Sequence, residues 1–428
     1  MSLIALSLCS LSLISAVESG NIQVTVSPPW TLVLKEGAAA PQQVTVDAPD
    51  VVAVRDEKHD TLPVWDPNGA RYSRAARFEQ MTTAECSAAG TLVTGSVRIK
   101  NGAGDAAVYE EGKDYALDPL WGHFGRIETS TVPEGKPVYA DYSYVKQRLD
   151  SVVIDASGKA VVRRGTPAMG VVPPPELQPG DKPVVNVWIA GPVDALSDEN
   201  LFPVTPDLKP ALPASSGTAE KLLPNTLRKL RSGEKLTLVA WGDSVTAMSV
   251  YQNQFVARLK ERFPKADINL ITAAWGGRGS RNYLEAPAGG EKDFVRDVLD
   301  PKPDVVVMEW VNDAYLDEAG VQTHYGGILS RLRGVGAEVI ILTPHLVRPD
   351  WMAMTTLKFD EDPRPYVKGL RRFAAENNVA LADGSKMWCQ AWRHGIPYLS
   401  MLENSINHPD KRGHALFADA LMSLFPEK

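Results

Sequence analysis

The hydrophobic pattern of the chain changes its period near residue 217, and this change limits the folds that the chain can adopt. From residue 21 to about 213, apolar and polar residues alternate over short runs separated by turn residues, as in 22–26 and 138–144. A period of two is typical of half-buried strands. After residue 217, continuous apolar runs alternate with amphipathic stretches of helical period. The sequence therefore predicts two regions of different fold class.

The first region is predicted to be all-β over residues 20–213. Residues 152–154 and 160–162 are apolar and face each other across a short Asp-Ala-Ser-Gly-Lys turn. The pair Asn101-Gly102, which follows another alternating run, is a hairpin signal. Hardly any stretch of this region has a helical period. We therefore expect a sandwich-like fold, either one β-sandwich or two small ones in series.

The second region is predicted to be an α/β domain over residues 214–428. Residues 203–217, rich in proline, alanine and serine, have the composition of a semi-rigid linker. Apolar runs that alternate with helical stretches indicate a parallel sheet covered by helices on both faces. Such a sheet binds ligands beyond the carboxyl ends of its strands. The expected strands are 236–241, 268–273, 305–310, 338–342 and 379–382, and the helical stretches include 253–263, 366–377 and 413–424.

A serine directly follows the first of these strands, in the tripeptide Gly242-Asp243-Ser244. A serine at a strand-to-helix turn presents its hydroxyl at the edge of the sheet, where the hydroxyl can act as a nucleophile. Asp and Ser are also common N-cap residues of helices. The tripeptide alone therefore leaves a catalytic and a structural interpretation open.

Hydrogen-bond donors follow the next two strands. Gly276 and Gly277 come after the second strand, and glycine allows a backbone N–H group to approach a substrate oxygen closely. Asn312 comes after the third strand, and its side-chain amide can donate to an oxyanion. Asp313 is predicted to cap the helix that follows.

Two histidines lie near the start of the last helical stretch. His408 is held in the preceding loop by Pro409, which makes it the better candidate for a general base. His414 begins an amphipathic run and is expected to pack within the helix.

These four blocks, in this order, resemble the motifs of the SGNH (GDSL-type) hydrolases, and the resemblance covers residues 217–428. It implies that Ser244 is the nucleophile, that His408 is the general base, and that Gly277 and Asn312 donate to the oxyanion. It also implies a flavodoxin-like three-layer fold and hydrolysis of acyl esters without a metal or cofactor. The blocks of Gly277 and His408 look most like those of polysaccharide acetylesterases.

The chain departs from this family at one position. The family usually has an aspartate three residues before the histidine, where this sequence has Ser405. In a catalytic triad the acid orients the imidazole and stabilises its charged form. Glu403, Asp410 or a backbone carbonyl group could take this place, and the sequence does not decide among them.

The start of the chain predicts export. Residues 3–16 form an apolar run followed by small residues, which is typical of a secretory signal peptide over residues 1–19, cleaved near Ala16 or Ser19. An uncleaved anchor or a buried strand is the alternative. The mature protein is expected to be secreted or periplasmic and not to insert into a membrane, because no other segment approaches 18 continuous apolar residues. Cys86 and Cys389 either pair or are free buried thiols.

Charge and tryptophan content bear on the substrate. The net charge is −7 without blocks of like charge, which excludes a basic nucleic-acid interface. Trp241, Trp275 and Trp310 precede three of the four blocks, and indole faces suit sugar rings, although Trp241 and Trp310 could simply pack under helices. We expect an acetylated polysaccharide or oligosaccharide as substrate. The alternatives are a lipase, thioesterase or arylesterase of the same family, or a catalytically weak glycan-binding protein.

Overall fold

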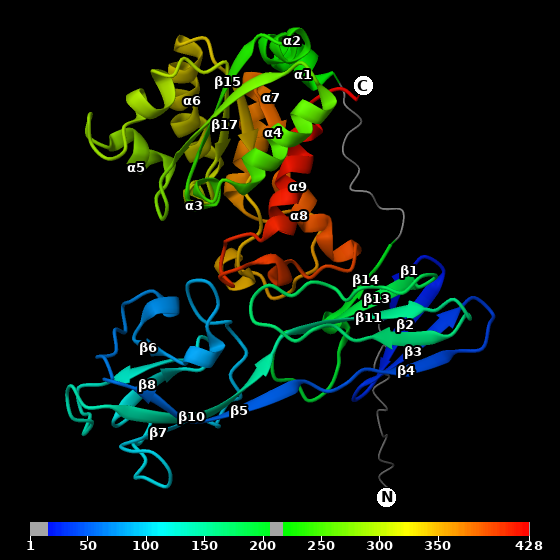
Figure 1. Cartoon of the computed structure of the whole chain (residues 1–428), viewed down its shortest axis with the longest axis vertical. Helices are drawn as coiled ribbons and strands as arrows, with labels where there is room; N and C mark the ends of the chain where they lie inside the picture. Colours follow the sequence, from blue (N-terminus) through cyan, green and yellow to red (C-terminus); the bar gives the residue numbers. More distant parts are fainter. Residues whose placement is uncertain (1–15, 206–216, 428) are drawn as a thin grey trace, which may run out of the picture.

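A computed structural model describes residues 16–205 and 217–427 of the chain. Figure 1 shows an α/β region that lies against a β-rich region. Most of the predicted signal peptide, together with the domain boundary predicted between residues 213 and 214, lies outside the described residues. Export and the domain boundary therefore stay predictions.

The α/β region is built on a five-stranded parallel sheet with the order β16-β15-β17-β18-β19. This order is that of a flavodoxin-like sheet, so the predicted fold class is confirmed. The strands are β15 (Lys235–Gly242), β16 (Asp267–Ala274), β17 (Val305–Glu309), β18 (Glu338–Leu342) and β19 (Ala380–Ala382). Their continuous apolar character is explained by helices on both faces, which bury all of β17 and all of β18 except its first residue.

Each face of this sheet has its own apolar core. Helices of the first face pack around residues such as Leu236, Leu238 and Phe417, and those of the second face pack around Trp241 and Trp310. The first face holds α1 (Thr218–Leu222), α2 (Pro224–Ser232), α4 (Val250–Arg262), α8 (Gly384–Gln390) and α9 (Lys411–Met422). The second holds α5 (Ser280–Glu285), a π-helical turn (Val295–Leu299), α6 (Glu318–Gly334) and α7 (Pro365–Asn377).

Two antiparallel sheets form a first β unit. They share one core, to which Val24, Leu32, Val185 and Val187 contribute. The predicted hairpin is present, with Val152 opposite Val162. One sheet consists of β1 (Val17–Ser19), β2 (Ile22–Ser27), β3 (Thr31–Glu36) and β4 (Gln42–Thr45), and the other of β11 (Arg148–Ile154), β12 (Ala160–Arg163), β13 (Lys182–Ile189) and β14 (Leu201–Pro203).

A second β unit has a separate core. Its centre is a stack of aromatic rings, in which the Phe78 ring lies 4.7 Å from that of Phe124 and 4.2 Å from that of Tyr142. Two separate cores give two small β units, but the expectation that they follow in series is wrong, because β5 to β10 are inserted between β4 and β11 of the first unit. The strands are β5 (Asp50–His59), β7 (Arg98–Lys100) and β10 (Val138–Lys146) in one sheet and β6 (Ala76–Arg77), β8 (Tyr115–Asp118) and β9 (His123–Arg126) in the other.

The first described strand bears on the predicted cleavage site. β1 pairs Val17 with Val24, and the buried Ser19 hydroxyl donates to the carbonyl oxygen of Val204 at 2.7 Å. Cleavage after Ser19 would remove this strand, whereas cleavage after Ala16 would retain it. Across the described parts of the chain, no helix combines the length and the apolar character needed to cross a bilayer.

Buried side chains decide three open points of the sequence. Trp241 and Trp310 are fully buried, with ring centroids 5.0 Å apart, so the packing interpretation is correct and their proposed use as sugar platforms is wrong. Cys86 and Cys389 are both buried free thiols. His414 lies within α9, is fully buried and stacks on Tyr251, as expected.

The β-rich region contacts the segment that connects α8 with α9. Asn186 donates to the carbonyl oxygen of Gly395 at 2.8 Å, and the Val172 amide donates to that of Ser400 at 3.0 Å. Figure 1 shows the part of the α/β region that contains α8 and α9 facing the β-rich strands. This contact matters for the site, because the connecting segment carries His408.

Candidate active site

Ser244 lies at the carboxyl edge of the sheet because the chain turns sharply after β15. It begins the short helix α3 (Ser244–Ala247). At the turn, a Cβ atom on Gly242 would lie 2.1 Å from the Thr246 hydroxyl oxygen and 2.3 Å from the Glu309 carbonyl oxygen. Only glycine fits so close an approach. The turn lies beside β16 and β17, where the order of the strands reverses and ligands bind in such folds.

Asp243 is the N-cap of α3, which leaves the Ser244 hydroxyl free for other contacts. The fully buried Asp243 carboxylate accepts the Val245 amide at 3.1 Å and the Asn312 amide at 3.0 Å. Burial raises the pKa of Asp243 to about 7, and these N–H groups oppose the shift. The structural role proposed for the tripeptide thus belongs to Asp243, which ties the Ser244 turn to the Asn312 turn.

His408 lies against the serine. Its Nε2 atom is 2.9 Å from Ser244 Oγ, and its side chain is 15% exposed. Asn404 shapes the loop, since its Oδ1 atom accepts the backbone N–H groups of residues 406, 407 and 408 at 2.9 to 3.0 Å. Two residues that lie far apart in the sequence are therefore held at hydrogen-bond distance by separate local structures.

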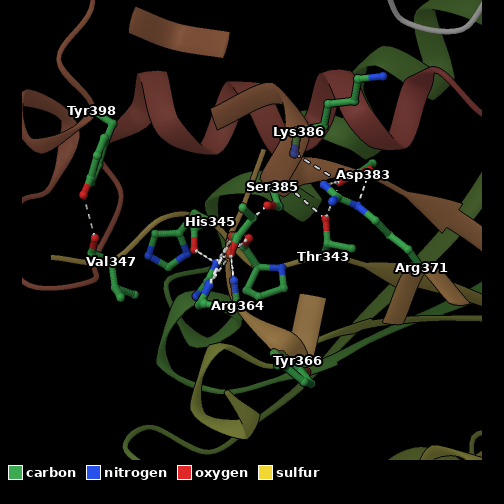
Figure 2. Close-up of polar contacts among 12 residues, drawn as sticks. Thr343, His345, Val347, Arg364, Tyr366, Arg371, Asp383, Ser385, Lys386 and Tyr398 are labelled. Carbon is green, nitrogen blue, oxygen red and sulfur yellow. Dashed lines mark hydrogen bonds and ion pairs between the residues drawn. The ribbon is translucent and has the colours of Figure 1, made fainter. Parts of the chain in front are cut away.

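A buried polar network that includes His345, Arg364 and Tyr398 (Figure 2) contacts the histidine loop at Asn407. The His345 ring donates from Nε2 to the carbonyl oxygen of Asn407 at 2.6 Å, and Arg364 donates to the His345 carbonyl oxygen at 2.7 Å. Tyr398 donates to the carbonyl oxygen of Val347 at 3.0 Å. Burial holds the pKa of His345 well below its usual range, so this ring stays neutral. The network fixes the segment after β18 and, through Asn407, the position of His408.

The glycine turn and Asn312 complete the surroundings of Ser244. A Cβ atom on Gly276 would lie 3.7 Å from Ser244 Cβ, so this turn passes directly beside the serine. Gly277 has a φ of +69°, a left-handed conformation that favours glycine. The Asn312 side chain donates from Nδ2 to the Arg278 carbonyl oxygen at 3.3 Å. The structure thus brings all four residues selected from the sequence to one edge of the sheet.

Asp313 has a different role from the one predicted. Its carboxylate accepts the Ser280 amide at 2.9 Å, the Ser280 hydroxyl at 2.5 Å and the Tyr325 hydroxyl at 3.0 Å. The next helix, α6, is capped by Asp317 instead. The prediction that Asp313 caps this helix is therefore wrong, because the buried carboxylate joins the glycine turn to the Asn312 turn.

Residues 240–416 match the model of the GDSL-like lipase/acylhydrolase family. This segment is a GDSL-like hydrolase domain. All four site residues lie within it, and the family is one of ester hydrolases. No curated protein matches the chain.

The GDSL-like domain is also similar to solved structures. LAE5, an alpha/beta hydrolase enzyme from the metagenome of Lake Arreo, Spain, is 21% identical over 44% of this chain and 94% of its own, with a TM-score of 0.36. Axe2, an acetylxylan esterase from Geobacillus stearothermophilus, is 17% identical over 45% and 95%, with a TM-score of 0.37. CEX, a two-domain esterase active on acetylated mannans, is 21% identical over 48% and 55%, with a TM-score of 0.37.

Glu403 and Asp410 are the two acids near His408 in the sequence, and neither contacts the His408 imidazole. Asp410 is the N-cap of α9, where its carboxylate accepts the amides of Arg412 and Gly413. Glu403 meets the loop through its backbone, since its N–H group donates to the His408 carbonyl oxygen at 2.7 Å. Ser405, at the family's usual aspartate position, takes a left-handed φ of +55°.

The carboxylate next to the imidazole comes from the β-rich region. Glu85 Oε1 lies 3.3 Å from His408 Nδ1. Sequence reasoning missed Glu85 because the search for an acid was confined to residues close to His408 along the chain. The turn that carries Glu85 has no catalytic motif, so only the packing of the two regions reveals this contact.

The charge state of His408 leads to a prediction on pH dependence. Burial lowers the pKa of His408 below its ordinary 6.5, and the Glu85 carboxylate partly opposes this shift. His345 and His414 lie behind it, and burial keeps both neutral, with the pKa of His414 lowered to about 4. A general base must be unprotonated. We expect kcat/KM for p-nitrophenyl acetate to be at its plateau above the His408 pKa and to fall as the pH drops through this pKa, with a midpoint below pH 6.5. A midpoint above 6.5 would mean that the Glu85 charge outweighs burial.

Proposed function

We propose that the protein is a serine esterase with Ser244 as nucleophile and His408 as general base. The observation that carries this proposal is the 2.9 Å contact between Ser244 Oγ and His408 Nε2. His408 takes the hydroxyl proton while Oγ forms a bond to the ester carbonyl carbon. The amides of Ser244 and Gly277 and the Asn312 side chain hold the resulting oxyanion.

The second half of the proposed reaction returns the enzyme to its starting state. When the carbonyl re-forms, the bond to the alcohol oxygen breaks and His408 gives its proton to that oxygen. Water then attacks the acyl-serine, with His408 taking the proton from water and returning it to Ser244 Oγ. The products are an alcohol and a carboxylic acid, so protons and bonds balance over the cycle.

The proposed substrate is an acetyl ester on a polysaccharide, and two exposed rings support this choice. Trp351 is 48% exposed and Tyr72 is 37% exposed, with ring centroids 6.0 Å apart. Trp351 donates its amide to the Arg348 carbonyl oxygen, and Arg348 donates its amide to that of Ile406 in the histidine loop. Exposed aromatic faces beside the site suit the C–H faces of sugar rings.

Charge favours a neutral glycan. The chain carries a net charge of −7, which offers no general attraction to an anionic polymer. Arg278 and Arg281, both exposed near the glycine turn, are the local cations that such a polymer could use. We propose that the protein acts outside the cytoplasm, secreted or periplasmic, since a polysaccharide substrate and the predicted signal peptide agree.

The substrate proposal is tested by comparing polymeric and small esters. We expect acetate release from acetylated xylan or pectin, and faster cleavage of p-nitrophenyl acetate than of a long-chain p-nitrophenyl ester. Trp351→Ala is expected to raise KM for the polymer between about twofold and tenfold, because a stacking ring contributes about 1 kcal/mol. Its activity on p-nitrophenyl acetate should not change.

The controls separate the alternative functions. Val335→Ala is the matched control, because Val335 is another exposed apolar residue, at the C-terminal cap of α6. This variant should change neither KM for the polymer nor activity on p-nitrophenyl acetate. A preference for long acyl chains would favour a lipase or thioesterase instead. Binding of the glycan without release of acetate would favour the glycan-binding alternative.

A further inference from the structure

We propose that Glu85 of the β-rich region is the acid that orients His408, in place of the aspartate that the GDSL-like domain lacks at position 405. The inference rests on the proposed serine esterase function. It assigns to the β-rich region a direct part in the catalytic centre. Glu85 acts through His408 and is therefore a positioning residue.

Glu85 lies at the tip of a tight turn that holds its backbone in place. Thr82 and Ser87 pair at the base of the turn, and the Thr83 amide donates to the Cys86 carbonyl oxygen at 2.7 Å. Arg77 donates to the carbonyl oxygen of Glu85 at 2.6 Å. The carboxylate therefore extends from a fixed backbone, although its side chain is 56% exposed.

Both carboxylate oxygens of Glu85 contact the histidine loop. Oε1 lies 3.3 Å from His408 Nδ1, and Oε2 accepts the Asn404 side-chain amide at 3.0 Å. The other end of the same Asn404 side chain accepts the backbone N–H of His408 at 2.9 Å. One asparagine thus connects the acid with the loop that carries the base, and this connection keeps the carboxylate beside the imidazole.

The turn is docked on the hydrolase domain on both sides of Glu85. The Ala84 amide donates to the Glu403 carbonyl oxygen at 3.3 Å, and the Cys86 thiol donates to the Asn404 carbonyl oxygen at 2.7 Å. Burial raises the pKa of Cys86 to about 11, so the group is a thiol with a proton to donate. Cys86 is fully buried in a small apolar cluster with Trp121 and Ile406. This cluster joins the two regions next to the acid and sets its position.

The arrangement supplies what a triad acid supplies. When Nδ1 carries the proton and donates it to Glu85, the lone pair of His408 is on Nε2, which faces Ser244 Oγ. The carboxylate also stabilises the imidazolium that forms during the reaction. Because Glu85 is half exposed, water weakens this charge interaction. We expect a smaller effect than that of a buried triad aspartate, whose loss costs about 10⁴-fold in kcat.

Glu85→Gln removes the charge of the acid while keeping an oxygen that can accept the Nδ1 proton. We expect kcat for p-nitrophenyl acetate to fall between about tenfold and a thousandfold with KM unchanged. The acidic limb of the pH profile should move to lower pH, because the carboxylate raises the pKa of His408. His345 and His414, which face His408 from behind, and Glu403 and Asp410 on its own loop are unchanged in this variant. Glu85→Ala also removes the oxygen and should lose at least as much activity.

Glu403→Gln is the matched control, since it removes a carboxylate that belongs to the histidine loop but does not contact the imidazole, and it leaves Glu85 unchanged. It should keep wild-type kcat and the wild-type pH profile. A Glu85→Gln variant with wild-type kcat would overturn the inference. So would a loss of kcat that comes with a lower melting temperature and an unshifted acidic limb, because a merely structural role predicts that pattern.

Ser244→Ala separates failure of this inference from failure of the proposed function. An active Ser244→Ala variant would reject the serine esterase mechanism and with it the role of Glu85. An inactive Ser244→Ala variant beside an unaffected Glu85→Gln variant would reject only the role of Glu85.

Discussion

Replacement of Ser244 by alanine is expected to reduce kcat for p-nitrophenyl acetate by a factor on the order of 10⁶, to the level of residual binding and oxyanion stabilisation. The reason is that the variant lacks the oxygen that forms the bond to the acyl carbon. The fold should not change, because the turn depends on Gly242 and on the Asp243 cap rather than on the serine hydroxyl. Steady-state kinetics and thermal melting of the same preparation test both statements.

Ser249→Ala is the control for the loss of a serine hydroxyl near the same turn. Among the described residues, the Ser249 hydroxyl donates only to the Ala247 carbonyl oxygen, at 3.4 Å. Ser249 lies just before α4. This variant should keep wild-type kcat. If Ser244→Ala kept more than about a tenth of the wild-type kcat, another group would have to be the nucleophile.

Replacement of His408 by alanine is expected to lower kcat between about 10⁴-fold and 10⁶-fold, since Ser244 then has no base within hydrogen-bond distance. The loop should persist, because it is held by the Asn404 side chain and by the His345 contact to Asn407 rather than by the imidazole. The variant removes a ring that is 15% exposed, so a free base from solvent can enter the space that the ring leaves. We therefore expect added imidazole to restore part of the activity of His408→Ala.

The double variant Ser244→Ala/His408→Ala provides the background for this rescue. It should be no slower than either single variant, because serine and histidine act as one unit. With added imidazole, the double variant should hydrolyse the ester no faster than imidazole does in buffer without the protein. If the double variant were rescued as well as His408→Ala, imidazole would be hydrolysing the ester without the serine, and the role of His408 would be contradicted.

Local sequence patterns predicted much of the α/β region because each pattern has a direct physical cause. Apolar runs become central strands when both faces of a sheet are covered, and the expected strand 338–342 agrees with β18 (Glu338–Leu342). The residue types of the four blocks were informative for the same reason, since strand ends meet at one edge of a parallel sheet. Ser244, Gly277 and Asn312 therefore lie at this edge, whereas His408 reaches Ser244 from the segment between α8 and α9.

Local sequence patterns did not predict the direction of side chains or the packing between distant elements. Trp241 and Trp310 stand next to site residues in the sequence yet point into the core. Asp313 was expected to cap a helix but binds Ser280 and Tyr325. In each case the competing partners lie on other elements, so the choice depends on how those elements pack.

The sequence by itself determined the two fold classes and the positions of the turns that follow the strands of the parallel sheet. These follow from hydrophobic period and from turns, which are properties of neighbouring residues. The tertiary structure alone decided which acid faces His408. Ser405 stands at the position of the family's usual aspartate, and the carboxylate that lies 3.3 Å from His408 Nδ1 is that of Glu85. The physical reason is that the interaction of a carboxylate with an imidazole depends on their separation in space and not on their separation in sequence. The apolar cluster of Cys86, Trp121 and Ile406 joins the two regions next to Glu85.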